Sequence, residues 1–322
     1  MNRRRLGKNG PEVSEVGFGT WGIGRSMWVG ARDEESARAL HRAIDLGIDF
    51  VDTALAYGDG HSERLVGRGI LSRKCGVRVA TKVPPLNQEW PARRGVPVED
   101  VFPANHIVAC AERSLRNLGF SSIDLLQLHV WQDDWTDRGD WRDAVERLKR
   151  EGKIRLFGIS INDHEPENAL RIVATGIVDT VQVIYNIFDQ SPEDRLFPEC
   201  LKRGVGVIAR VPLDEGGLTG RVTPEATFPR GDFRNEYFAG DRKREVFERV
   251  TKIAADLDVP LERMPQIALR FVLSHPAVST VIPGMRCVAN VEANVAVGDG
   301  RGLPAEAVAK LRAHRWARNF YS

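Results

Sequence analysis

Four side chains that can exchange protons stand at or just beyond the ends of short apolar segments. Asp52 closes FVD, Lys82 closes VATK, Tyr57 follows in the loop after Asp52, and His129 directly follows IDLLQL. A phenol has a reference pKa of about 10, and a nearby ammonium group lowers it. We expect Lys82 to lower the pKa of Tyr57 and Asp52 to keep Lys82 charged and oriented. With His129 binding a substrate oxygen, the set suits proton delivery to a developing alkoxide.

Each of these residues alone has a plainer interpretation. Asp52 could cap a turn, Tyr57 before Gly58 could be a loop aromatic, and Lys82 could reach solvent from the end of an apolar strand. His129 could be a hydrogen-bonded core histidine. Their occurrence together, at the ends of successive strands, favours the shared chemical role.

The elements that must position them alternate between strand and helix. Hydrophobic patterning and the placement of Gly and Pro predict these boundaries. The predicted strands are Glu15–Phe18, Ile48–Val51, Val77–Lys82, Ile123–Leu128, Ile154–Ile159, Thr180–Ile184, Gly206–Ala209 and Thr280–Ile282. The predicted helices are Asp33–Leu46, Ser62–Gly69, Ala104–Leu118, Trp141–Arg150, Glu167–Ala174, Glu193–Arg203, Arg242–Leu257, Leu261–Leu273, Val288–Val295 and Ala305–Phe320.

Eight strands separated by helices indicate parallel βα units. A doubly wound sheet usually has fewer strands per domain, whereas a (β/α)8 TIM barrel needs eight repeats, so we predict an α/β barrel. Its long βα loops and extra C-terminal helices account for the remaining length. No Gly/Ser/Pro-rich linker divides the chain, which predicts one domain over residues 1–322. In such a barrel the C-terminal strand ends face the active site.

Composition excludes several other classes of protein. The 322 residues are 42% hydrophobic and 28% charged, which is typical of a folded globular chain. The sequence contains no apolar run long enough to form a transmembrane helix, so no membrane span is predicted. The net charge of +2 argues against nucleic acid as a partner. The basic N-terminus lacks the apolar segment of a signal peptide, so we expect a cytoplasmic protein. No metal site is predicted, because neither the histidines nor the scattered Cys75, Cys110, Cys200 and Cys287 show ligand spacing.

One glycine motif has two interpretations. Residues 17–22, GFGTWG, match the GxGxxG dinucleotide fingerprint and follow a predicted strand. That fingerprint requires a helix to open within it, and the following IGRSMW does not favour a helix. We therefore expect a βα loop of the barrel, in which glycines let the backbone approach a ligand.

The chain resembles the aldo-keto reductase superfamily along almost its whole length. The resemblance is carried, in order, by GIDFVDTALAYGDGHSERLVGRGI, VATK, LLQLHVW, FGIS, VQVIYN, PLDEGGLTG and VIPGMRCVANVEAN. It implies a barrel that binds NADP(H), with NAD(H) possible, and passes hydride between nicotinamide C4 and a carbonyl carbon. It also implies a catalytic tetrad of Asp52, Tyr57, Lys82 and His129. Tyr57 would be the general acid in reduction and the general base in oxidation.

The same resemblance implies a set of cofactor contacts. Besides Asp52, they are Gly19, Thr20 and Trp21 after the first strand, Ser160 and Gln182 at the carboxamide, Arg210, Val211, Pro212, Leu213, Gly216, Leu218 and Thr219 after the seventh strand, and Gly284, Met285, Arg286, Asn290 and Asn294 at the adenosine end.

The chain departs from the family pattern at three of these places. Ser160 is separated from Asn162 by Ile161, Arg210 replaces the usual nicotinamide-stacking Tyr, and Ala293 replaces a Glu near the adenine. A guanidinium can stack on a flat ring but adds charge. Arg286 can clamp a 2′-phosphate, which favours NADP(H) over NAD(H).

The substrate is a small carbonyl compound or alcohol that the sequence does not specify further. The expected pocket residues are Trp21, Trp28, Tyr57, His129 and Trp131, with Trp135 and the segment Phe228 to Phe238 as further candidates. A polar mouth would suit a sugar or polyol, and an apolar one would suit a simple aldehyde. Two other functions stay open: an NADP(H)-sensing regulatory subunit, and an aldolase that forms a Schiff base on Lys82. The oligomeric state is not predicted.

Overall fold

A ring of eight parallel strands forms the centre of the protein. The computed structural model describes residues 1–73 and 76–317. The order in the sheet is β10-β9-β8-β7-β6-β5-β4-β3, and parallel bridges from Val16 to Val281 and from Gly19 to Gly284 join its two edges. The predicted barrel is therefore confirmed. Its strands are β3 (Phe18–Gly19), β4 (Phe50–Asp52), β5 (Arg78–Val83), β6 (Ile123–Leu128), β7 (Ile154–Ser160), β8 (Thr180–Ile184), β9 (Gly206–Arg210) and β10 (Val278–Val281).

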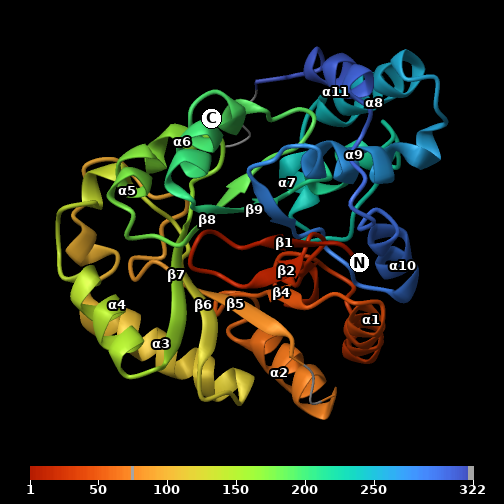
Figure 1. Ribbon diagram of the computed structural model, residues 1–322. Helices are drawn as coiled ribbons and strands as arrows, with labels where there is room; N and C mark the ends of the chain where they lie inside the picture. Colours follow the sequence, from red (N-terminus) through yellow and green to blue (C-terminus); the bar gives the residue numbers. More distant parts are fainter. Residues whose placement is uncertain (74–75, 318–322) are drawn as a thin grey trace.

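Helices surround this ring on the outside (Figure 1). Helix α4 shows why they form there, since Trp141, Ala144, Val145 and Leu148 are buried along one face at helical spacing. The helices are α1 (Asp33–Asp45), α2 (His61–Arg73), α3 (Ala104–Leu118), α4 (Trp141–Arg150), α5 (Leu170–Thr175), α6 (Leu196–Arg203), α7 (Arg234–Tyr237), α8 (Arg242–Asp256), α9 (Met264–Leu273), α10 (Val288–Val295) and α11 (Ala305–Arg312).

An N-terminal hairpin, which the sequence analysis missed, lies across the middle of the ring. It consists of β1 (Arg3–Arg5) and β2 (Glu12–Ser14), paired antiparallel (Figure 1). Leu6 and Val13 of this hairpin are buried in one apolar cluster with side chains of the barrel strands and Ile282, which directly follows β10. The hairpin thus closes the N-terminal end of the barrel. The other members of this cluster are Phe50, Ala80, Leu125, Leu156, Ile208 and Ile282.

Several predicted boundaries shift by a few residues. The first strand is Phe18–Gly19 rather than Glu15–Phe18, and the predicted helix Glu167–Ala174 begins as a 3₁₀ turn at Pro166. The last helix ends at Arg312; Phe320, where its end was predicted, lies outside the described residues, as does Cys75. Pro166 suits the first position of this turn, because proline is favoured in the first turn of a helix.

The GFGTWG motif does not form a dinucleotide fingerprint. After Gly19 the chain makes only a 3₁₀ turn at Trp21–Ile23, and the next α-helix begins at Asp33. Gly19 is needed for barrel closure, because a Cβ there would lie 2.6 Å from the carbonyl oxygen of Ile282. The interpretation as a βα loop is confirmed.

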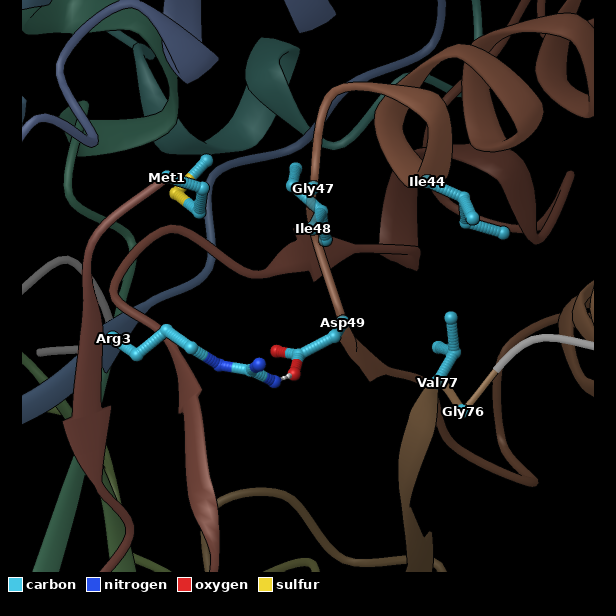
Figure 2. Close-up of a pocket in the computed structure, with 8 residues that line it drawn as sticks. All are labelled: Met1, Arg3, Ile44, Gly47, Ile48, Asp49, Gly76 and Val77. Atoms are coloured by element: carbon cyan, nitrogen blue, oxygen red, sulfur yellow. Dashed lines mark ion pairs between the residues drawn. The ribbon is translucent and has the colours of Figure 1, made fainter.

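A shallow hollow lies at the N-terminal ends of β4 and β5, away from the candidate site. Figure 2 shows Arg3 of the hairpin reaching across it to pair with Asp49. Among residues 1–73 and 76–317, no helix is both long and apolar enough to cross a bilayer. The same residues contain no group of three or more His, Cys, Asp or Glu side chains that could hold a metal ion.

Candidate active site

Asp52 and Lys82 form a buried ion pair at the C-terminal ends of adjacent strands. Lys82 Nζ donates to Asp52 Oδ2 at 2.6 Å and to the Thr53 carbonyl oxygen at 2.8 Å. Gln182 Nε2 donates to the other Asp52 oxygen at 2.8 Å. Both oxygens of the carboxylate are therefore held, and the ammonium group has a fixed position under the barrel mouth.

Tyr57 lies over this ion pair, in the loop between β4 and α2. Its ring centroid is 5.1 Å from Lys82 Nζ and 5.7 Å from the ring of His129. The loop after β3 packs closely behind it, since a Cβ on Gly24 would lie 2.9 Å from the Tyr57 Cβ. Gly58 takes a positive φ of 64°, which lets the chain turn directly after the tyrosine.

The pKa of Tyr57 is raised, contrary to the expectation from the sequence. Burial is the largest cause and the Asp52 carboxylate adds to it, whereas the guanidinium of Arg210 lowers the pKa. Burial also lowers the pKa of Lys82, which its pairing with Asp52 opposes. Desolvation disfavours the charged form of both groups and thus outweighs the predicted effect of the ammonium on the phenol.

His129 completes the mouth from the end of β6. Burial, with the positive charges of Lys82 and Arg210, holds the pKa of its imidazole well below 6.5. The ring is therefore neutral near pH 7. Within the described part of the chain, its Nδ1 has no hydrogen-bond partner. A neutral imidazole at this position can donate one hydrogen bond to a substrate oxygen.

The structure adds Trp90, which the sequence analysis did not select. Its ring meets the ring of His129 edge-on at 4.6 Å, and the residue is 45% exposed. The loop carrying it, residues 84–103, is fastened to the loop after β7 by Asn162, whose amide exchanges hydrogen bonds with the backbone of Ala92 at 3.0 and 3.3 Å. Gln132 also donates to the Ala92 carbonyl, at 2.6 Å. The only sequence signal was the position of this loop directly after the Lys82 strand.

The structure places Trp131, a predicted pocket residue, in a buried aromatic cluster. Its side chain is fully buried and packs edge-on against Trp135 at 5.8 Å and Trp141 at 5.4 Å. Trp135, also proposed for the pocket, is 2% exposed in the same cluster. The aromatic side chains of the segment after β6 thus pack with Trp141 of α4.

Trp21 and Trp28 lie together in the loop after β3, with rings 5.9 Å apart. Two arginines flank Trp28: Arg234 at 4.4 Å and Arg286 at 5.4 Å from its ring. Arg286 also donates to the Val29 carbonyl oxygen at 2.9 Å. The Arg234 guanidinium also lies 4.5 Å from the ring of Phe228, which belongs to the long loop after β9. These contacts hold the loop after β3 and the loop after β9 against each other.

Most of the residues that the resemblance assigned to the cofactor lie on or after the four neighbouring strands β7 to β10, and the others, Gly19, Thr20, Trp21 and Asp52, lie on or after β3 and β4. Ser160 and Gln182 are paired in register on β7 and β8, and Arg210 ends β9. Leu218 is fully buried, and the Thr219 hydroxyl is used within the turn, donating to the Gly216 carbonyl at 2.6 Å. The other predicted residues of this loop are Val211, Pro212 and Leu213, and those that follow β10 are Gly284, Met285, Arg286, Asn290 and Asn294.

Glu215 is a second residue that the sequence analysis missed. It lies in the loop after β9 with a φ of 52°, and burial, with Asp214 and Asp163 nearby, raises the pKa of its carboxyl to about 8. Its carboxylate form raises the pKa of Tyr57, so it lies near the phenol. Its place in the motif PLDEGGLTG gave no signal of this.

Comparisons with known proteins agree with this geometry. A model of the Aldo/keto reductase family matches residues 15–315. Aldo-keto reductase YhdN from Bacillus subtilis (strain 168) is 30% identical over 305 residues, covering 91% of this chain and 87% of its own. Glycerol dehydrogenase AKR11B4 from Gluconobacter oxydans is 28% identical with a TM-score of 0.77, covering 97% of this chain and 94% of its own. An aldo/keto reductase from Klebsiella pneumoniae, solved with NADP and acetate, is 26% identical with a TM-score of 0.67, covering 99% and 98%. The chain belongs to the aldo/keto reductase family.

Proposed function

We propose that the protein is an NADP(H)-dependent oxidoreductase that transfers hydride between nicotinamide C4 and a carbonyl or alcohol carbon, with Tyr57 moving the proton. The observation that carries this proposal is the buried Asp52–Lys82 ion pair beneath the Tyr57 ring, at the same mouth as His129. Family membership and the NADP complex of the Klebsiella pneumoniae relative support it.

The described residues fit a dinucleotide along the rim of the barrel. A Cβ on Gly284 would meet no atom within 4 Å, and on Gly216 the nearest atom would be 3.8 Å away, so open space borders the backbone at both places. The Arg286 guanidinium lies beyond Gly284 in the same segment and suits a phosphate. Because Gln182 gives its Nε2 to Asp52, it would meet the carboxamide through its oxygen. These features favour NADP(H) over NAD(H).

The bound cofactor supplies the hydride, and the side chains manage the charge that develops on the substrate oxygen. Tyr57, protonated because its pKa is raised, donates its proton to that oxygen during reduction. Neutral His129 orients the same oxygen by a hydrogen bond. The Lys82 ammonium stabilises the phenolate left behind, and Asp52 keeps the ammonium in place. In oxidation the proton moves in the opposite direction.

The substrate would enter between Trp90 and the loop after β9. Trp90 offers an apolar face beside His129, while Arg210, Asp163 and Glu215 place polar groups at the same mouth. Such a mixed lining suits a small carbonyl compound or alcohol that carries further hydroxyl groups, such as a polyol or sugar. Simple aldehydes without hydroxyl groups could undergo the same reaction, but they would make fewer hydrogen bonds with this lining.

The proposal is tested by cofactor binding and turnover measured together. We expect NADPH to quench the tryptophan fluorescence, and the protein to reduce an activated aldehyde such as 4-nitrobenzaldehyde. Tyr57→Phe should lower kcat at least about 100-fold with an unchanged Kd for NADPH, because only the proton donor is lost. The matched control is Tyr185→Phe, which removes a hydroxyl bonded to Glu193 instead. Absence of cofactor binding, or full activity in Tyr57→Phe, would refute the proposal.

The two alternative functions gain no specific support from the geometry. An aldolase needs an uncharged lysine that substrate can reach, and Lys82 is fully buried and ion-paired with Asp52. A purely sensing subunit does not require the arranged set of Asp52, Tyr57, Lys82 and His129.

A further inference from the structure

Arg210 crosses the top of the sheet at the place proposed for the nicotinamide. It ends β9, and its Nη2 donates to the carbonyl oxygen of Ile161 at 2.9 Å and pairs with Asp163, both in the loop after β7. Strand β8 lies between β7 and β9 in the sheet. The guanidinium therefore extends past the strand ends that carry Ser160 and Gln182, the two predicted carboxamide contacts.

At the mouth of the barrel, the positive charge of Arg210 has a larger effect than the negative charge of its partner Asp163. The side chains of Arg210 and Asp163 are only 20% and 22% exposed, so water screens their charges incompletely. Arg210 lowers the pKa of Tyr57 by more than Asp163 raises it, and Arg210 also lowers the pKa of His129. Glu215 does not cancel the charge near pH 7, because a pKa of about 8 leaves its carboxyl mostly protonated.

The other charged groups at this mouth are already balanced. Lys82 and Asp52 are 2.6 Å apart, so their charges largely cancel at a distance. Tyr57 and His129 are neutral near pH 7, since the pKa of the first is raised and that of the second is lowered. Arg210 is thus the charge that a ligand beside Ser160 and Gln182 meets.

An oxidised nicotinamide ring carries a positive charge and a reduced ring does not. A fixed cation beside the ring therefore disfavours the oxidised form by Coulomb repulsion. We propose that Arg210 makes the cofactor site bind NADPH in preference to NADP⁺, and that Asp163 limits the strength of this preference. The inference rests on the proposed function, because it needs the nicotinamide to lie at the ends of β7 and β8.

Such a preference has a direct consequence for the reaction. Weaker binding of NADP⁺ speeds its release after carbonyl reduction and favours its exchange for NADPH. The family's aromatic residue at this position stacks on the ring without a charge, so it cannot distinguish the two forms in this way. The Arg210–Asp163 pair would adapt this chain to reduction.

The test measures the ratio of the Kd for NADP⁺ to the Kd for NADPH by fluorescence titration at low salt. Arg210→Gln should lower this ratio about fivefold, and Asp163→Asn, which leaves Arg210 without its carboxylate, should raise it by a similar factor. The matched control is Arg155→Gln, which removes an equal charge from a side chain 71% exposed at the other end of β7. It should leave the ratio unchanged.

The opposite directions expected for the two variants distinguish charge from shape. If both variants shift the ratio the same way, or neither shifts it, the inference is wrong. If Arg210→Gln fails to fold, Asp163→Asn still decides, because an unchanged or lowered ratio refutes the inference. A wild-type protein that binds neither form would refute the proposed function itself, whereas binding of both forms with ratios insensitive to Arg210 refutes only the preference.

Discussion

Tyr57 shows how burial and charge compete at a single side chain. Burial and Asp52 raise the pKa of the phenol, and Arg210 opposes them. In the proposed mechanism, the protonated phenol is the form that reduction requires, and the phenolate is the form that oxidation requires. The surroundings of Tyr57 thus favour reduction before any substrate is bound.

This balance predicts different pH profiles for the two directions. Because the pKa of Tyr57 is raised and that of His129 is well below 6.5, both groups stay neutral from about pH 6.5 to about pH 7.5, where Glu215, with a pKa of about 8, also stays mostly protonated. We expect kcat/KM for carbonyl reduction to be flat over that range. For alcohol oxidation it should rise with pH, because the phenolate fraction rises. Steady-state assays in both directions check this, and a reduction rate that already falls within this range would show that the pKa of Tyr57 is lowered instead.

The Asp52–Lys82 ion pair should also matter for stability. Lys82→Met leaves a buried carboxylate without its cation, so we expect the free energy of unfolding to fall by about 3–5 kcal/mol. Arg113→Met is the matched control, because its partner Asp59 is 82% exposed, and it should cost less than about 1 kcal/mol. Urea denaturation of both variants measures the difference. Equal losses would mean that the buried pair contributes no more than a surface pair.

For individual residues, the sequence predicted which strand-end side chains lie at the site, but not which loop side chains do. Asp52, Lys82 and His129 follow from the barrel rule, because a strand end places its side chain at the mouth. Trp131 and Trp90 do not, since the path of a loop decides whether a tryptophan enters the core or faces the site. Nothing in the local sequence of either loop specifies that path.

The loop of residues 84–103 brings Trp90 to the candidate substrate site and is fastened to the barrel by a neighbouring loop. Asn162 joins the Ala92 backbone from the loop after β7, close to Trp90 in the chain. The position of Ile161 between Ser160 and Asn162 therefore has a structural consequence. It leaves Ser160 at the strand end and places the asparagine where it fastens the neighbouring loop.

We expect Trp90→Ala to raise KM about three- to tenfold while kcat changes less than about twofold, because in the proposed site the ring contacts substrate but no proton passes through it. Asn162→Ala should raise KM in the same way by loosening the loop. Leu86→Ala is the control, since Leu86 is 48% exposed in the same loop. Steady-state kinetics with one carbonyl substrate checks all three variants. A fall in kcat with constant KM would place Trp90 in the chemical step instead.

Element boundaries were predictable where hydrophobic periodicity and stop signals agree. Helix α3 matches its predicted bounds, because Pro103 precedes its first residue and Gly119 follows with a φ of 71°. The hairpin was missed because β1 is three arginines and β2 only three residues long, so neither shows an apolar pattern. Its buried residues, Leu6 and Val13, become informative only once the barrel interior is known.

The whole molecule separates chemistry and closure at opposite ends of the barrel. The C-terminal strand ends carry the candidate site, and the β1–β2 hairpin closes the N-terminal ends (Figure 1). The alternation of strands and helices was sufficient to predict this architecture, because eight βα repeats have few other solutions. That residues 1–322 form one domain remains a prediction, supported by a single sheet that takes strands from Phe18 to Val281.

This separation predicts that the hairpin can be weakened without loss of catalysis. Leu6 is 1% exposed within the barrel cluster, so Leu6→Ala should lower the free energy of unfolding by about 2–5 kcal/mol. Leu201→Ala, at a side chain 51% exposed on α6, should change it by less than about 0.5 kcal/mol. Below the unfolding temperature, kcat and KM of both variants should stay within about twofold of wild type, because no hairpin residue reaches the mouth. A Leu6→Ala protein that stays folded yet loses turnover would show instead that the hairpin acts on the site through the barrel interior.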